Sequence, residues 1–187
     1  MEALQMAEGS ILLWIQEFLR ADWLTPVMLT ITKLGNLGFI WVVLSLLFLC
    51  FRKTRWAGAA GLLAVFFSVA FNNYFLKNLF ERIRPYEVID GLTLLVHKAS
   101  DFSFPSGHAG SSFAAATAFF WILRGKIGAA AYVLAFLIAF SRLYIGIHYP
   151  TDVLCGMITG SLCGLAAGVL INKAKSKLEE FKAAKSR

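Results

Sequence analysis

The sequence predicts an all-α integral membrane protein: a helical bundle of five spans, preceded by amphipathic helices that lie in the membrane interface. Hydrophobic residues make up 58% of its 187 residues and the mean hydropathy is +0.68, which is too apolar for an ordinary water-soluble globule. The apolar residues also cluster in runs of about 17 to 25 residues, the length that crosses a bilayer. No repeat or linker divides the chain, so we expect a single domain over residues 1–187.

Five apolar runs carry this prediction. They lie near residues 36–52, 56–80, 107–124, 127–145 and 150–172. Each is long enough to cross or nearly cross the hydrocarbon core as a helix. Residues 1–9 contain no Lys or Arg, so nothing there resembles a cleavable signal, and we expect the first span to direct the chain to the membrane.

Residues 1–34 form the interfacial segment of the prediction. Polar residues interrupt the apolar stretch 10–32 near its middle: Gln16, Glu17, Arg20 and Asp22. Each charge at the centre of a spanning helix costs about 2.5–3.5 kcal/mol on insertion scales. The apolar residues share one helical face, as in a helix lying on a membrane: Ile11, Ile15, Phe18 and Leu19. Pro26 is expected to begin a second short helix, and a sixth span over 10–32 is the alternative.

The basic residues give the chain an orientation. Eleven of the eighteen lie in three places: Arg52 to Arg55, Arg124 to Lys126, and the tail 173–187. These places follow the first, third and fifth spans, so they lie on one side of the membrane, which the positive-inside rule makes the cytoplasm. The net charge of +7 therefore reflects the orientation of the chain in the membrane and implies no nucleic-acid partner. We expect a multi-pass plasma-membrane protein with an extracytoplasmic site and a basic cytoplasmic tail.

Small residues form a stripe in the last span. Four glycines recur there at intervals of four residues: Gly156, Gly160, Gly164 and Gly168. Such a stripe lets another helix backbone approach closely. A neighbouring span of the same bundle would explain it, and a homodimer seam is the alternative. The three cysteines fall inside apolar segments without metal-ligand spacing, so we expect neither a disulfide nor a metal site.

Three polar clusters at the ends of apolar runs carry the chemistry. In the first, Lys77 and Arg84 are seven residues apart, so both would point the same way on one helix before Pro85 ends it. Together they could hold one phosphate, although either alone is as readily a cation that reaches from a span end to the water. Glu81 and Arg82, which lie between them, are interpreted as surface charges.

The second cluster has the sequence PSGH and runs from Pro105 to His108. Ser106 fits the N-cap of the next helix, so that Gly107 and His108 open it and free backbone N–H groups face an incoming anion. The alternative is a plain helix cap beside an interfacial polar residue, and this motif alone leaves the two open.

The third cluster, SRLYIGIHYPTD, runs from Ser141 to Asp152. Pro150 fits the first turn of the last span, which leaves His148 at the helix entrance with Asp152 four residues on. A carboxylate that fixes the imidazole tautomer leaves the other ring nitrogen free to attack phosphorus, while Arg142 would stabilise the equatorial oxygens. Because Tyr149 precedes a proline, this spacing by itself does not guarantee contact between the histidine and the aspartate.

Together the three clusters resemble the signature of the type 2 phosphatidic acid phosphatase superfamily. That signature is Lys, six residues, Arg-Pro; then Pro-Ser-Gly-His; then Ser-Arg, five residues, His, three residues, Asp, and the chain fills every position in order. The resemblance implies His148 as the nucleophile, Asp152 as its partner and His108 as the acid that protonates the leaving oxygen. It also implies a phosphate-binding set: Lys77, Arg84, Ser106, Gly107 and Arg142. No metal or other cofactor is implied, since protein cations take its place.

The resemblance implies a phosphatase, and the bilayer indicates its substrate class. A site at the outer ends of membrane helices receives phosphate at headgroup depth, so we expect a lipid substrate whose tail stays in the bilayer. The small size of the chain and its outward-facing site look most like bacterial undecaprenyl-diphosphate phosphatases. Phosphatidylglycerophosphate and phosphatidate are the alternative substrates. A phosphotransferase using the same His148 is a further alternative. Non-enzymatic lipid binding or transport is disfavoured, because binding needs no nucleophile, acid and orienting carboxylate together.

The segment 86–104 between the first two clusters mixes apolar and polar residues. We interpret it as an interfacial loop that flanks the pocket. His97 within this loop is interpreted as a solvated residue without a catalytic role.

Overall fold

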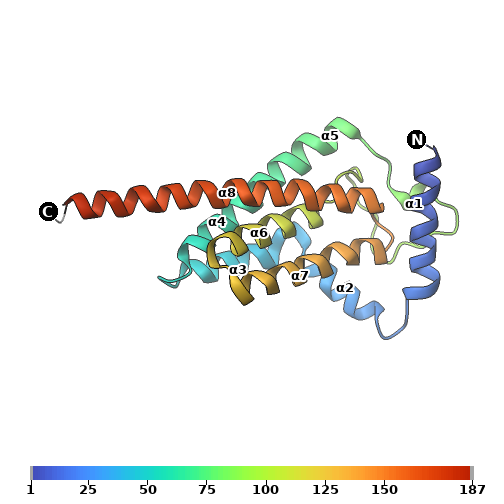
Figure 1. Cartoon of the computed structure of the whole chain (residues 1–187). Coiled ribbons are helices and arrows are strands. Elements are labelled where there is room, and N and C mark those ends of the chain that lie inside the picture. The colour runs from blue at the N-terminus through green and yellow to red at the C-terminus, as the bar shows by residue number, and fades with distance from the viewer. Residues whose placement is uncertain (1, 186–187) are drawn as a thin grey trace.

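The computed structural model describes residues 2–185, and Figure 1 shows them as an elongated bundle of helices. The helices are α1 (Glu2–Trp14), α2 (Thr25–Leu34), α3 (Phe39–Leu49), α4 (Arg55–Ser68), α5 (Lys77–Phe80), α6 (Gly107–Leu123), α7 (Gly125–Tyr144) and α8 (Pro150–Lys185). Shorter helical segments join them: η1 (Ile15–Leu19), η2 (Asn36–Gly38), η3 (Val69–Leu76) and η4 (Pro85–Glu87). The described residues contain no strand, so the predicted all-α fold is confirmed. Met1 and the last two residues of the predicted tail, 186–187, lie outside the described residues.

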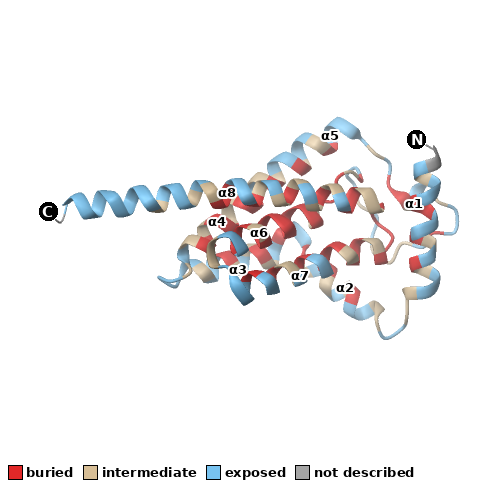
Figure 2. Cartoon of the chain, in the orientation of Figure 1, coloured by how far each residue is buried: buried red, intermediate tan, exposed pale blue. Residues whose placement is uncertain are grey.

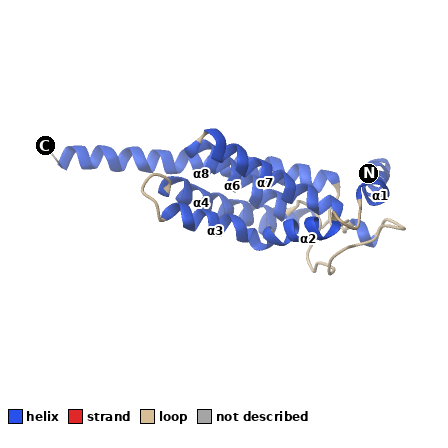
Figure 3. Cartoon of the chain, turned by 90° about the horizontal axis from the view of Figure 1, so that it is seen from below, coloured by secondary structure: helices blue, strands red, loops and turns tan. Residues whose placement is uncertain are grey.

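Helix α6 forms the centre of the bundle. It packs against α4, α7 and α8, which run alongside it in Figures 1 and 3. Its sequence explains this position, because small residues cover most of its surface and ten of its seventeen residues are buried. Helix α3 is joined to it by Trp41, whose Nε1 donates to Ser112 Oγ at 2.8 Å.

The glycines of α8 are buried against α6: Gly156, Gly160, Gly164 and Gly168. A Cβ atom on Gly156 would lie 2.6 Å from the backbone oxygen of Ser106, and one on Gly168 would lie 2.7 Å from the Trp121 ring. Only glycine allows the two helices to come this close. The stripe packs against α6 within the chain, as intramolecular packing predicts, and a homodimer stays an untested prediction.

The membrane spans follow the predicted runs in outline. Three helical segments among the described residues are long and apolar enough to cross a bilayer: Arg55–Glu87, Gly125–Tyr144 and Pro150–Lys185. Helix α2 and residues 36–49 would make a fourth span, bent by 50° at the break between them. With 17 residues, α6 is at the short end of the range that crosses a bilayer. The membrane-type helical bundle is therefore confirmed, and the count of five spans stays a prediction.

The outer surface of the bundle is apolar. Figure 2 shows buried residues along the inner faces of the helices and exposed residues along the outside. Large apolar side chains are exposed there, among them Phe66, Phe71, Phe136, Leu154 and Leu162. Such a surface suits contact with lipid tails and not with water.

Helix α1 lies crosswise at the end of the bundle where α6 and α8 begin (Figure 1). The chain leaves the helical conformation between η1 and α2, so the stretch 10–32 is not one continuous helix, which favours the interfacial segment over a sixth span. Pro26 lies in the first turn of α2, as predicted. Ile11 and Phe18 are exposed but Ile15 is buried, so the predicted apolar face is only partly turned outward.

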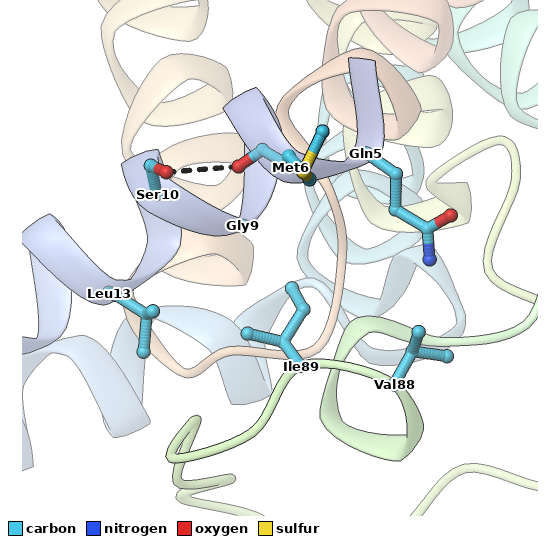
Figure 4. Close-up of a pocket in the computed structure, with 7 residues that line it drawn as sticks. All are labelled: Gln5, Met6, Gly9, Ser10, Leu13, Val88 and Ile89. Atoms are coloured by element: carbon cyan, nitrogen blue, oxygen red, sulfur yellow. Dashed lines mark hydrogen bonds between the residues drawn. The ribbon is translucent and has the colours of Figure 1, made fainter. Parts of the chain in front are cut away.

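One side of α1 borders a groove of about 610 Å³ whose other wall is the loop after η4 (Figure 4). Its lining residues are Gln5, Met6, Gly9, Ser10, Leu13, Val88 and Ile89. A Cβ atom on Gly9 would lie 3.3 Å from Ile89 Cδ1, so the helix approaches this loop closely. The N-terminal helix is thus packed onto the segment that follows the first polar cluster.

Candidate active site

A cavity of about 310 Å³ lies at the end of the bundle where α6 and α8 begin. Six of the eight predicted site residues line it: Lys77, Arg84, Gly107, His108, Arg142 and His148. The other two, Ser106 and Asp152, are buried next to lining residues. The structure therefore brings residues of all three polar clusters to one place.

His148 stands between a carboxylate and the cavity. It lies in the loop between α7 and α8, and Pro150 begins α8 as predicted. Its Nδ1 is 3.5 Å from Asp152 Oδ2, and its Nε2 is 3.5 Å from Arg84 Nη1. Both separations are at the long limit for a hydrogen bond. The ring therefore turns one nitrogen toward Asp152 and the other toward the cation-lined cavity.

The carboxylate of Asp152 is fixed by several donors. Its Oδ2 accepts from Ser103 Oγ at 2.5 Å and from the backbone N of Tyr149 at 2.9 Å. Its side chain is fully buried. Burial, together with the charges of Arg84 and Arg142, lowers the pKa of His148 from 6.5 to about 3 even though Asp152 opposes the shift. The imidazole is neutral at pH 7, the state in which a ring nitrogen keeps the lone pair that a nucleophile needs.

Lys77 and Arg84 reach the cavity by a route other than the predicted one. Helix α5 ends at Phe80, Glu81 adopts a left-handed conformation with φ 45°, and the backbone of Arg84 is extended. The prediction that one helix carries both cations up to Pro85 is wrong, because the chain leaves the helix three residues after the lysine. The two side chains converge through tertiary contacts instead.

Asp101 supplies those contacts. One of its carboxylate oxygens accepts from Lys77 Nζ, and the other accepts from Arg84 Nη2 at 2.6 Å. Burial raises the pKa of Asp101, but hydrogen bonds and charge from the two cations outweigh it, so the pKa lies below its ordinary value. An ionised carboxylate thus balances the charge of the two cations that an incoming phosphate would contact.

The hinge between α2 and α3 completes the cavity. His108 Nε2 lies 3.0 Å from Asn36 Oδ1, and Arg142 Nη1 donates to Thr32 Oγ1 at 2.6 Å. Arg142 is buried, and its Nε has no hydrogen-bond partner among the described residues. A Cβ atom on Gly35 would lie 2.6 Å from His108 Cδ2, so the hinge can pass this close only with glycine. The Nε donor of Arg142 is therefore unused beside the cavity.

The start of α6 follows the PSGH prediction. Ser106 is the N-cap, and its Oγ accepts from the backbone N of Ala109 at 3.4 Å. Gly107 lines the cavity, and a Cβ atom there would lie 2.6 Å from Asn73 Oδ1. Asn73 belongs to η3, where π-helical winding shifts the side chains relative to an α-helix. Ser106 serves the helix cap in this structure, and a direct contact between its hydroxyl and phosphate stays a prediction.

Sequence reasoning missed several residues of this site. Asp101 and Ser103 lie four and two residues before Pro105 of the PSGH cluster, and this nearness is the signal that could have found them. Thr32 and Asn36 come from a segment with no such signal, and only the fold brings them to the cavity. No group of three or more His, Cys, Asp or Glu that could hold a metal ion occurs within residues 2–185.

The model of one protein family matches residues 57–176, which contain all three clusters and the core helices. That family is the PAP2 superfamily. The chain belongs to it. The predicted family is thus confirmed, and membership of the PAP2 superfamily indicates a hydrolase of phosphate ester or anhydride bonds.

Individual relatives of this PAP2 protein are phosphatases. It is 29% identical over 145 residues to the undecaprenyl-diphosphatase of Sulfolobus acidocaldarius, an alignment that covers 74% of this chain and 66% of the relative. It is 35% identical over 157 residues to phosphatidylglycerophosphatase B of Bacillus subtilis, covering 77% of this chain and 73% of that one. The crystal structure of the first transmembrane PAP2-type phosphatidylglycerolphosphate phosphatase, from Bacillus subtilis, matches with a TM-score of 0.76 and 31% identity, over 92% and 88% of the two chains.

Proposed function

We propose that the protein is a metal-independent lipid phosphatase that cleaves a phosphomonoester or diphosphate headgroup through a phosphohistidine intermediate on His148. The observation that carries this proposal is the placement of the neutral imidazole, with Nδ1 toward Asp152 and Nε2 beside Arg84 in the cavity. The chain is proposed to act as one domain, with residues 1–34 at the interface and 173–187 as a basic cytoplasmic tail.

The reaction has two steps. In the first, His148 Nε2 attacks phosphorus, the bond from phosphorus to the leaving oxygen breaks, and His108 gives that oxygen a proton. Asp152 accepts a hydrogen bond from the Nδ1–H group of the resulting imidazolium. The cations Lys77, Arg84 and Arg142 stabilise the equatorial oxygens of the phosphoryl group. In the second step, water attacks phosphorus and gives a proton back to His108, the N–P bond breaks, and inorganic phosphate leaves.

A second cavity supports a diphosphate substrate. Its volume is about 560 Å³ and it shares Ala99 and Arg142 with the catalytic cavity. Lys33, Asn36 and His97 also line it, so donors are available for a second phosphate next to the one that is attacked. In undecaprenyl diphosphate that second phosphate stays on the leaving lipid. His97, interpreted from sequence as a solvated loop residue, thus gains a proposed binding role.

Two alternatives use the same chemistry. Phosphatidylglycerophosphate and phosphatidate would place a monoester in the catalytic cavity, and phosphatidylglycerophosphatase B is among the relatives. A phosphotransferase would pass the phosphoryl group from His148 to a lipid or sugar hydroxyl in place of water. Non-enzymatic lipid binding or transport would leave the histidines and Asp152 without a purpose.

We propose that the site faces the extracytoplasmic side of the plasma membrane. The loops at residues 52–55 and 124–126 and the C-terminal part of α8 lie at the end of the bundle away from α1 (Figure 1). These are the places where the basic residues concentrate, and the positive-inside rule assigns them to the cytoplasm. The catalytic cavity lies at the opposite end.

The proposal is tested by phosphate release from purified protein in EDTA. The substrates are undecaprenyl diphosphate, phosphatidylglycerophosphate, phosphatidate and a soluble ester, with His148→Ala as the control. We expect release from lipid substrates, with undecaprenyl diphosphate preferred, and none from the variant. Phosphate release only after addition of a divalent metal would contradict the metal-independent mechanism.

A further inference from the structure

We infer that Arg82 is a positioning residue for Asp152, and that Glu8 on α1 holds Arg82 in place. The N-terminal helix then belongs to the catalytic apparatus, although it lies outside the three motifs. This inference rests on the proposed role of Asp152 as the partner of His148. The sequence-based interpretation of Arg82 as a surface charge is wrong, because its guanidinium lies between the carboxylates of Asp152 and Glu8.

The guanidinium of Arg82 bridges two carboxylates. Its Nη1 donates to Asp152 Oδ1 at 2.6 Å, and its Nη2 donates to Glu8 Oε2 at 2.5 Å. Glu8 and Asp152 are buried, with 2% and 0% of their surface exposed. Two buried carboxylates without a cation between them would be strongly destabilising, because neither could recover its lost hydration. Arg82 therefore forms an internal ion-pair network and is not a solvated charge.

Further contacts fix the orientation of this guanidinium. Its central carbon lies 3.8 Å from the ring centroid of Tyr149. The backbone oxygen of Arg82 accepts from the backbone N of Ser103 at 2.8 Å, and Ser103 Oγ donates to Asp152 Oδ2. Arg82 thus holds one oxygen of Asp152 directly. Ser103, whose backbone N donates to the backbone oxygen of Arg82, holds the other oxygen. The carboxylate that faces His148 has little freedom to rotate.

Glu8 ties this network to the start of α8. Its Oε1 accepts from the backbone N of Thr151 at 2.9 Å and from Thr151 Oγ1 at 2.5 Å. Arg82 Nη1 also donates to Thr151 Oγ1 at 2.8 Å. Since Asp152 follows Thr151 directly, α1 contacts the first turn of α8 at the point that carries the catalytic carboxylate.

The test compares Arg82→Met, Arg82→Lys and Glu8→Gln with wild type in single-turnover phosphoenzyme formation and in steady state. Arg82→Met should lower kcat about 10- to 100-fold, by analogy with the loss measured when a residue that orients a metal ligand is removed. KM should stay within about twofold, because phosphate binding is untouched. Arg82→Lys should keep part of the activity, because lysine retains the positive charge but lacks the two-pronged guanidinium. Glu8→Gln should lower kcat less than Arg82→Met does. Lys98→Met, an exposed cation of the neighbouring loop, is the matched control.

Folding is separated from positioning by expressing every rate per mole of folded protein, measured by thermal melting in detergent. If Arg82→Met does not fold, Arg82→Lys and Glu8→Gln decide the question. Rates of the folded variants within about twofold of wild type would overturn the inference, as would a rise in KM with unchanged kcat. If wild type itself releases no phosphate, the proposed function fails. If wild type is active and the variants match it, only the role of Arg82 fails.

Discussion

Nε2 of His148 lies 3.5 Å from Nη1 of Arg84, on the side of the ring opposite Asp152. The arginine is held by the backbone oxygen of Ile147 at 3.0 Å and by the loop that carries Asp101. A phosphate bound by this guanidinium would therefore have its phosphorus next to the ring nitrogen proposed to attack it. Binding and positioning for attack are achieved by the same residue.

Removal of the Asp101 carboxylate should strengthen the binding of anions. Asp101 pairs with both Lys77 and Arg84, so an anion in the cavity competes with it for the two cations and is repelled by its charge. The interaction energy of two unit charges about 4 Å apart is about 1 kcal/mol in water. Asp101→Asn should therefore lower the inhibition constant of vanadate, a mimic of pentacoordinate phosphorus, about fivefold. Weaker inhibition in this variant would show instead that the carboxylate positions the cations.

The stability of the protein should depend on pH through His148. Its pKa is lowered from 6.5 to about 3, so between these values the unfolded chain binds a proton that the folded protein does not. Stability is therefore lost as pH falls below about 6.5, by up to about 2 kcal/mol at pH 5 relative to pH 7. His148→Gln cannot titrate and should lose less. Equal shifts of the unfolding midpoint for both proteins between pH 7 and pH 5 would contradict this prediction.

The hinge at Gly35 should control the acid His108. A Cβ atom there would lie 2.6 Å from His108 Cδ2 and 2.7 Å from Ile138 Cγ2, so Gly35→Ala must displace the imidazole. We expect kcat for an alkyl phosphate lipid to fall about tenfold, a part of what general acid catalysis contributes. An aryl phosphate, whose leaving group needs no proton, serves as the control and should be affected much less. Equal loss on both substrates would indicate general damage.

The second cavity predicts selectivity between substrates. Lys33→Ala and His97→Ala should each lower kcat/KM for undecaprenyl diphosphate about tenfold, the value of one charge-assisted hydrogen bond. Phosphatidate, which has no second phosphate, should be hydrolysed as before. Lys98→Ala tests whether any positive charge in this loop has the same effect. Parallel losses on diphosphate and monophosphate would remove the basis for a diphosphate site.

The motifs predicted much of the site because their chemistry is local. PSGH predicts a helix N-cap, Pro150 predicts a helix start, and the structure has both at Ser106 and Pro150. The glycine stripe of α8 likewise predicted a close helix contact, but spacing alone could not distinguish α6 of the same chain from a second copy.

What the sequence could not predict depends on tertiary contacts. Lys77 and Arg84 fit one helix face by spacing, but the helix ends at Phe80, and Asp101 from the loop after η4 brings the cations together. Arg82 has the same local pattern as a surface arginine, and only the position of α1 makes it a bridge between two buried carboxylates. Such contacts leave no periodicity in the sequence.

Rapid-quench trapping would detect the proposed covalent intermediate on His148. Purified protein would be mixed in EDTA with a lipid substrate carrying ³²P in the phosphate to be transferred, then quenched within a single turnover. We predict a protein-bound label that is labile to acid and stable to alkali, maps to the peptide containing His148, and is absent from His148→Ala. Full phosphate release without such a label, or with the label on another residue, would contradict the mechanism.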